Sequence, residues 1–169
     1  LAAELGPMTV ADARLPMLKS ADDKHLGCAS CHGAHSFDTS NAAVDACLGC
    51  HADDHSLAWR DSPHGRLSLA VGPDNDSAVT CATCHLPRVR RRESTFDVSW
   101  TAVQHNQSDT LRPNEKMIRP VCLNCHGLAF AIDALADPAL IRSNFAGRPA
   151  KHVPSGLSLI DIYNDVSWR

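Results

Sequence analysis

The sequence predicts a mainly α-helical protein with much irregular loop, folded as a single domain over residues 1–169. The first observation is the length, because 169 residues fit one domain. The second is a set of short helix signals separated by stretches without periodicity. The third is a Cys-x-x-Cys-His motif that occurs four times and uses all eight cysteines. These motifs identify what fills the interior.

In Cys-x-x-Cys-His, the two thiols can form thioether bonds to one haem, and the histidine reaches the iron from the same side. The spacing suits a helical turn. Four copies predict four covalently attached haem c groups, with about 42 residues for each. Since aromatic residues make up only 5% of the chain, the closely packed haems would form most of the core. The predicted cysteine and proximal histidine sets are Cys28, Cys31 and His32; Cys47, Cys50 and His51; Cys81, Cys84 and His85; and Cys122, Cys125 and His126.

Structural zinc and disulfide bonds are the two alternatives for the cysteines. Paired Cys-x-x-Cys units often bind zinc, and a secreted chain with eight cysteines often pairs them. Neither alternative requires a histidine after every second cysteine. With 10 histidines in 169 residues, four such coincidences have a chance probability on the order of one in a hundred thousand, which favours haem.

Six further histidines are available for the four distal positions of the haems. His64 lies 17 residues before Cys81, and His105 lies 17 residues before Cys122. This equal offset predicts that His64 and His105 are both distal ligands. The remaining candidates are ligands of neighbouring haems or surface histidines beside a propionate, and the sequence leaves both readings open for His25, His35, His55 and His152.

Several segments have a predicted secondary structure. We expect one helix over residues 41–54, which carries the second motif, and a solvent-exposed turn or loop over 71–80. Residues 95–103 alternate apolar and polar side chains and are the best strand candidate. The arginine run at 88–92 is predicted to be a solvated face, with propionates or an acidic partner as the alternative.

Two helices are predicted near the C-terminal end of the chain, over 128–135 and from Asp137-Pro138 to Ser143. In the second helix, an aspartate cap precedes a proline at the first helical position. Their apolar side chains are expected to pack as core over the fourth haem, and they are Phe130, Ile132, Leu135, Leu140 and Ile141.

Charge and hydropathy restrict the partners. The formal net charge of −3 argues against nucleic acid, and ionised propionates would add up to about eight negative charges. We therefore expect redox partner proteins with a basic docking face. No apolar run approaches the roughly 20 residues of a membrane span. The start at Leu1-Ala2-Ala3 suits a processed, exported protein, and covalent haem attachment takes place outside the cytoplasm, so the expected location is the periplasm.

The second and third motifs, together with Trp59-x-x-Ser62-x-His64 between them, resemble the multihaem cytochromes c of the hydroxylamine-oxidoreductase type and their smaller tetrahaem relatives. The resemblance covers roughly residues 25–130. It implies a helical, loop-rich chain wrapped around haems in stacked and perpendicular pairs. It also implies that His64 ligates a haem other than those of its flanking motifs. The catalytic members of this family are longer and carry more haems.

The predicted function is electron transfer through four haems that are mostly or all bis-histidine ligated, between respiratory redox partners. A six-coordinate iron has no open site for substrate, so this reading favours a carrier over an enzyme. The alternative is an oxidoreductase in which one open-coordination haem acts on a small nitrogen or sulfur compound, with nearby histidine or arginine groups moving protons.

Overall fold

The computed structural model describes residues 28–33, 35, 38–72, 75–93, 97–111 and 113–153. Over these residues the fold is mainly helical with irregular loops and a two-stranded sheet, which confirms the predicted mainly α class. The helices are short, and none in these ranges is long and apolar enough to cross a membrane. In chain order the elements are a 3₁₀ turn (Cys28–Ser30), a π-helical stretch (Asn41–Asp45), α1 (Ala46–Leu48), α2 (Asp54–Ala58), a 3₁₀ turn (Trp59–Asp61), α3 (Pro63–Val71), α4 (Cys81–His85), β1 (Arg88–Glu93), β2 (Val98–Val103), α5 (Ser108–Leu111), 3₁₀ turns at Asn114–Met117 and Cys122–Asn124, α6 (Leu128–Leu135) and α7 (Pro138–Arg142).

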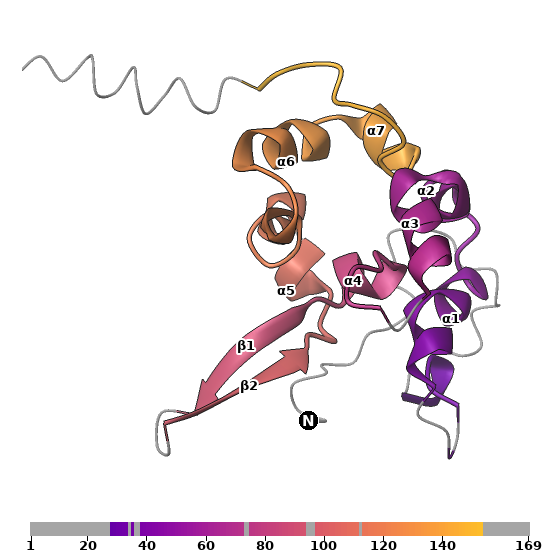
Figure 1. Cartoon of the computed structure of the whole chain (residues 1–169), viewed down its shortest axis with the longest axis vertical. Coiled ribbons are helices and arrows are strands. Elements are labelled where there is room, and N and C mark those ends of the chain that lie inside the picture. Colours follow the sequence, from indigo (N-terminus) through magenta and orange to yellow (C-terminus); the bar gives the residue numbers. More distant parts are fainter. Residues whose placement is uncertain are drawn as a thin grey trace, which may run out of the picture.

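The helices follow an arc. Figure 1 shows α1, α2 and α3 along one side, α7 at the top, and α6 and α5 along the other side. Helix α4, which is the third motif, lies closer to the middle, and the β1–β2 hairpin points away from the arc. Helices α2 and α7 are far apart in the sequence but pack against each other. This contact brings α7, near the C-terminal end of the described chain, next to the helix that follows the second motif.

The helix predicted over 41–54 is divided in the structure. Its helical backbone ends at Leu48, inside the second motif, and α2 begins after Asp53. The single-helix prediction is wrong because Asp53 has an extended backbone, with φ −78° and ψ 165°, and its carboxylate accepts hydrogen bonds from the Ser56 N–H at 3.1 Å and hydroxyl at 2.8 Å. An aspartate in this conformation starts a new helix instead of continuing the old one.

The two helices predicted near the C-terminal end are confirmed as α6 and α7. The carboxylate of Asp137 accepts hydrogen bonds from the N–H groups of Ala139 at 3.0 Å and Leu140 at 3.1 Å, and Pro138 takes the first helical position. Leu140 is buried, as expected of a core residue, whereas the Phe130 side chain is 39% exposed. The local cap signal therefore placed the helix correctly, but the expected apolar face is only partly covered.

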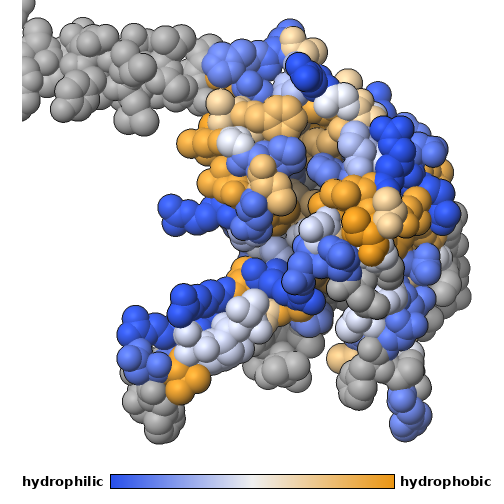
Figure 2. All heavy atoms as spheres, viewed as in Figure 1, coloured by the Kyte–Doolittle hydropathy of each residue, from blue (hydrophilic) through white to orange (hydrophobic). Residues whose placement is uncertain are grey.

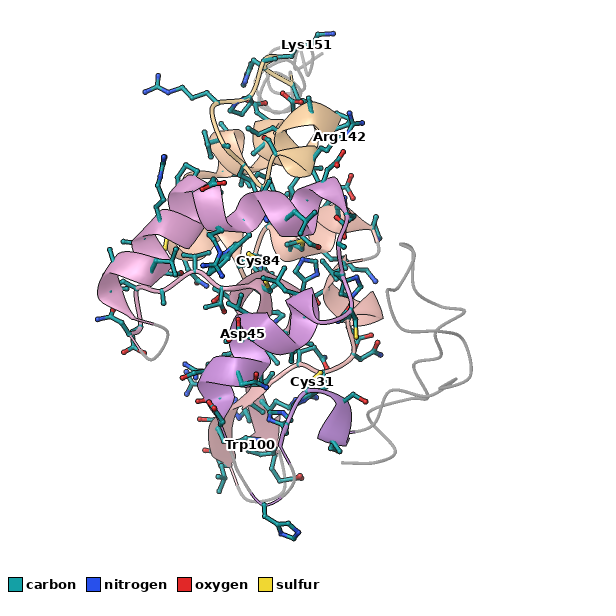
Figure 3. The ribbon with its side chains drawn as sticks, turned by 90° about the vertical axis from the view of Figure 1, so that its right-hand side faces the viewer. Cys31, Asp45, Cys84, Trp100, Arg142 and Lys151 are labelled. Atoms are coloured by element: carbon teal, nitrogen blue, oxygen red, sulfur yellow. The ribbon has the colours of Figure 1, made fainter. Side chains whose placement is uncertain are left out.

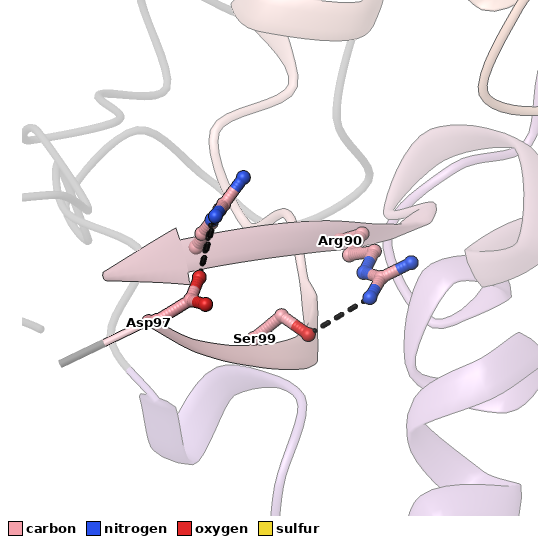
Figure 4. Close-up of polar contacts among 4 residues, drawn as sticks. Arg90, Asp97 and Ser99 are labelled. Carbon is pink, nitrogen blue, oxygen red and sulfur yellow. Dashed lines mark hydrogen bonds and ion pairs between the residues drawn. The ribbon is translucent and has the colours of Figure 1, made fainter. Parts of the chain in front are cut away.

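The predicted strand is present as β2, and its partner is the arginine run. Strands β1 and β2 form an antiparallel pair with Arg88 opposite Val103 and Glu93 opposite Val98. The structure describes the predicted strand only from residue 97 onward, since 94–96 lie outside the described ranges. Figure 4 shows two polar contacts across the hairpin, from Arg90 to Ser99 and from Arg92 to Asp97. The alternate residues 88, 90 and 92 are exposed, so the run is a solvated face as well as a strand.

The core made of protein side chains is thin. Trp59 is the only large aromatic side chain among the buried apolar residues of the described ranges, and three of the others are alanines. Large apolar side chains are exposed instead, and Figure 2 shows hydrophobic residues at the surface. The buried set is Val44, Trp59, Ala78, Met117, Ala131, Ala134 and Leu140; the most exposed large apolar residues are Leu57, Leu69, Val98 and Leu128.

Candidate haem attachment and ligand sites

Each Cys-x-x-Cys-His motif closes one helical turn. In three motifs the histidine N–H donates to the carbonyl of the first cysteine, at 2.8 to 2.9 Å, and the third motif is the helix α4 itself. The bonded pairs are His32 with Cys28, His51 with Cys47, and His126 with Cys122. A turn of this kind brings the two thiols and the imidazole of a motif to one side of the backbone. This is the geometry that attachment to a single macrocycle requires.

The third motif has the most complete local support. The hydroxyl of Thr80 accepts a hydrogen bond from the Thr83 N–H at 3.3 Å, and the Thr83 hydroxyl accepts one from the Thr80 N–H at 3.1 Å. This reciprocal capping box fixes the start of α4 directly before Cys81. Burial raises the pKa of the Cys84 thiol to about 12 and lowers the pKa of His85 to about 4, so both groups are held in their neutral forms. Figure 3 shows Cys84 near the middle of the molecule.

The thiols of successive motifs lie close together. Cys31 is near Cys47 and Cys50, whose charges add to the effect of burial in raising its pKa. Cys47 and Cys81 share a hydrogen bond, which raises the pKa of the first and lowers that of the second. Cys84 is near Cys122, whose charge also raises its pKa. All eight cysteines are free of disulfide bonds. The three proximities join each motif to the next one along the chain.

The Trp59-x-x-Ser62-x-His64 element is a compact turn that positions His64. The Trp59 indole N–H donates to the Val79 carbonyl at 3.0 Å, which ties the turn to the segment before the third motif. Ser62 is fully buried; its hydroxyl donates to the Trp59 carbonyl at 2.7 Å and accepts from the Gly65 N–H at 3.1 Å. Ser62 thus caps α3, and His64 is held in its first turn.

His64 faces the histidine of the fourth motif. The ring centroids of His64 and His126 are 6.0 Å apart, with an angle of 64° between the planes. Burial, and secondarily the charge of His126, lower the pKa of His64 and favour its neutral, ligand-competent form. On its other side, the His126 ring is stacked on Phe130, with centroids 4.9 Å apart.

A second histidine pair joins His55 in α2 with His85 in α4. Their ring centroids are 6.1 Å apart and their planes are inclined by 59°. Nδ1 of His55 lies 2.5 Å from the carbonyl oxygen of Ile141, so Nδ1 carries the hydrogen that it donates to this acceptor. The lone pair of His55 is consequently on Nε2. Histidines that bind metals characteristically hold their second ring nitrogen in a bond of this kind.

Both centroid separations fit two imidazoles that share one metal ion. Two metal–nitrogen bonds of about 2 Å and two imidazole radii of about 1.2 Å would allow ring centroids to lie up to roughly 6.4 Å apart. Rings in edge-to-face contact also have centroids about 4.5–7 Å apart, so the separation alone does not distinguish the two arrangements. The residues present are compatible with a haem iron between His55 and His85, and with another between His64 and His126.

The other histidines have no such partner among the described residues. His35 is exposed and has a left-handed backbone, with φ 63°. His105 follows β2 and is half-buried, and the ring contacts within the described ranges do not connect it to another histidine. His152 is bonded to Asp133, with Nδ1 and Oδ2 2.8 Å apart at the surface. His25 lies outside the described residues.

The first two motifs differ from the others in their histidine surroundings. Nδ1 of His32 is buried and lacks a hydrogen-bond partner within the described part of the chain. His51 is near enough to His85 for its charge to contribute, after burial and the charge of His55, to the lowered pKa there. Within the described ranges, which include all eight cysteines, no group of three or more histidine, cysteine or carboxylate side chains is arranged to hold a bare metal ion.

Sequence reasoning missed the residues that hold His55 in place. Besides the Ile141 carbonyl, the carboxamide of Asn144 donates to the His55 carbonyl at 3.1 Å, and the Phe145 ring lies against His55 and His64. No short motif marks this contact, because it joins α2 to the end of α7. The equal 17-residue offset does not correspond to equal surroundings, since His64 faces His126 whereas the ring contacts of the described residues do not join His105 to another histidine.

Comparison with known proteins gave no match to a family model, a curated protein or a solved structure.

Proposed function

We propose that this chain carries four covalently attached haem c groups and transfers electrons between redox partner proteins. The observation that carries this proposal is the presence of two pairs of facing histidines, His55 with His85 and His64 with His126, at centroid separations of 6.1 and 6.0 Å. In each pair one histidine belongs to a Cys-x-x-Cys-His turn and the other comes from a different part of the chain. A bis-histidine haem requires two axial histidines, and each of these pairs could supply them.

The residues proposed to hold the four groups are the motif cysteines and histidines. When bound, haem supplies a one-electron iron centre whose potential depends on axial ligands, burial and hydrogen bonds. The chain positions that centre. Its thiols fix the ring edge, the Ile141 carbonyl orients the imidazole of His55, and Ser62 with Trp59 orients that of His64. The thin protein core and the exposed apolar side chains leave surface for the macrocycles to cover.

Closed coordination favours a carrier over an enzyme. With both axial positions filled by histidine, the third and fourth sites would have no place for a substrate at the metal. The contact between Cys47 and Cys81 and the proximity of Cys84 to Cys122 would put neighbouring groups close together. A continuous row of closely spaced centres suits the movement of electrons along the chain.

The second candidate is an oxidoreductase acting on a small nitrogen or sulfur compound. It is favoured at the first two motifs, where neither His32 nor His51 has a facing histidine among the described residues. An open axial position there would admit a substrate, and a nearby histidine would handle protons. His25, His35 and His105 remain candidates to close these positions.

The proposed setting is the periplasm, since covalent haem attachment takes place outside the cytoplasm. The proposed partners are redox proteins with a basic docking face, because the propionates would add negative charge to a chain of net charge −3.

The decisive experiment measures haem content and coordination on one sample of the full chain, expressed with a haem-attachment system. A pyridine haemochrome assay and the intact mass should give four haems per chain. The low-temperature electron paramagnetic resonance (EPR) spectrum of the oxidised protein should show low-spin signals only. A high-spin signal that responds to nitrite, hydroxylamine or cyanide would favour the oxidoreductase instead, and a chain without covalent haem would overturn both candidates.

A further inference from the structure

The turn that ends α7 has an unusual backbone. Asn144 and Phe145 both have left-handed conformations, with φ 51° and 60°. Asparagine adopts this region readily, but phenylalanine rarely does. A bulky residue persists in such a conformation only where its surroundings fix it, and such positions cluster at functional sites. Here the Phe145 N–H donates to the Leu140 carbonyl at 2.8 Å, which closes the turn over the end of the helix.

Asn144 and the backbone carbonyl of Ile141, in the last turn of α7, hold His55. Asn144 is buried, with 8% of its surface exposed, and its carboxamide nitrogen lies 3.1 Å from the His55 carbonyl oxygen and 3.3 Å from His55 Nε2. Ile141 accepts the hydrogen of Nδ1. A metal ion at Nε2 would replace the longer of the two Asn144 contacts and leave the bond to the backbone in place. The turn thus fixes both the position and the tautomer of His55.

Phe145 lies beside both histidines that come from outside the motifs. Its ring centroid is 6.3 Å from that of His55, edge to face at 87°, and 6.1 Å from that of His64, at 62°. These distances are in the range of favourable aromatic pairs. A single side chain therefore packs against the distal member of each facing pair.

We propose that the Asn144–Phe145 turn is a positioning device for the distal histidines of two neighbouring haem sites. Asn144 acts on His55 alone, and Phe145 acts on His55 and His64 together. The inference rests on the proposed function, because it assigns the two histidines as ligands. Its distinctive consequence is that the two residues affect different numbers of sites, one and two.

The test is low-temperature EPR of the oxidised, full-length haem protein with substitutions in the turn. We expect Phe145→Ala to change two of the four low-spin signals, by shifting their g-values or converting them to high-spin. Asn144→Gly permits the left-handed backbone and removes the side chain with its carboxamide, so one signal should change, the same one that is lost in His55→Ala. Phe145→Tyr keeps the ring and should give the wild-type spectrum. Trp100→Ala, at an exposed aromatic residue of β2, is the matched control and should change none.

The outcomes separate the inference from the proposed function. Four haems per chain with an unchanged spectrum in Phe145→Ala, or with all four signals altered equally, would overturn the inference and leave the function standing. An Asn144→Gly spectrum that changes in two signals would also contradict it. If Phe145→Ala yields no folded protein, Phe145→Leu is judged by the same criterion. A wild-type chain without covalent haem would overturn the proposed function, and the inference with it.

Discussion

The rings of His64 and His126 face each other, with centroids 6.0 Å apart. His64 comes from the first turn of α3, and His126 ends the fourth motif. Their approach connects two parts of the chain that flank the third motif without belonging to it. Removal of either ring should therefore affect one haem site and leave the rest of the arc intact.

His64→Ala should open one axial position. The expected result is the loss of one of four low-spin EPR signals and the appearance of a high-spin signal that binds added imidazole or cyanide. His35→Ala is the control at an exposed histidine without a facing partner in the described ranges, and it should retain the third and fourth sites' signals. An unaltered His64→Ala spectrum would exclude His64 as a ligand.

Gly65→Ala should destabilise the protein strongly. A Cβ at Gly65 would overlap the Trp59 carbonyl oxygen and lie 2.7 Å from its carbon, so the turn that positions His64 would have to shift. We expect a loss of about 2 kcal/mol or more in the free energy of unfolding, measured by denaturant titration of the haem protein.

The matched control for this substitution is Gly49→Ala in the second motif. A Cβ at Gly49 would meet the nearest atom at 3.4 Å, and the backbone there has φ −64°, which alanine adopts without strain. Its free energy of unfolding should change by less than about 1 kcal/mol. Equal effects of the two substitutions would mean that the close approach of Gly65 to Trp59 is unimportant.

Arg92→Ala should have little effect on stability. The Arg92–Asp97 ion pair on the hairpin is 2.5 Å long, but its side chains are 71% and 77% exposed. Exposed pairs gain little because water and salt screen them, so the free energy of unfolding should change by less than about 0.5 kcal/mol. A loss several times larger, seen in the same denaturant titration, would show that the hairpin depends on this pair.

Asp137 should make stability depend on pH in the acidic range. Hydrogen bonds from the Ala150 N–H, and then from the N–H groups of the first turn of α7, lower the pKa of this carboxyl below its usual 3.8. Because the folded-state pKa is lowered, the stabilisation is fully present above the unfolded value and is lost as pH falls through the folded value. Thermal unfolding between pH 2.5 and about 6 should therefore show a steeper acid-side loss for the wild type than for Asp137→Asn. Parallel curves would contradict this assignment.

Local signals in the sequence predicted local structure well. The Asp137-Pro138 cap identified α7, and the two-residue spacer of each motif predicted a helical turn. The same logic fails for 41–54, because the side chain of Asp53 caps the next helix and its extended backbone does not continue the first one. The arginine run became a strand because β2 pairs with it, a stabilisation that lies outside the run itself.

The facing histidines could be predicted only in part. His64 was expected to serve a motif that does not flank it, but neither its proximity to His126 nor that of His55 to His85 is visible in spacing. His55 belongs to α2, which packs against α7, whereas the His64–His126 pair joins α3 to the segment before α6, so each pair joins parts of the chain that are distant in sequence. From the sequence, His55 could equally be a ligand or a surface residue. The group that orients its ring is the backbone carbonyl of Ile141, and a backbone group leaves no mark in the pattern of side chains.

The position of α7 also determines when the sites can be completed. Neighbouring motifs meet through thiols that follow one another along the chain, so these contacts can form as the polypeptide emerges from its N-terminal side. The groups that hold His55 come from Ile141 and Asn144, near the end of the described chain. His55, in the N-terminal half of the chain, can therefore be fixed only after the segment with Ile141 and Asn144 has been added and folded. If the proposed haems are attached, a chain that ends before α7 would lack both groups that hold His55, and the imidazole proposed for the third site would be unrestrained.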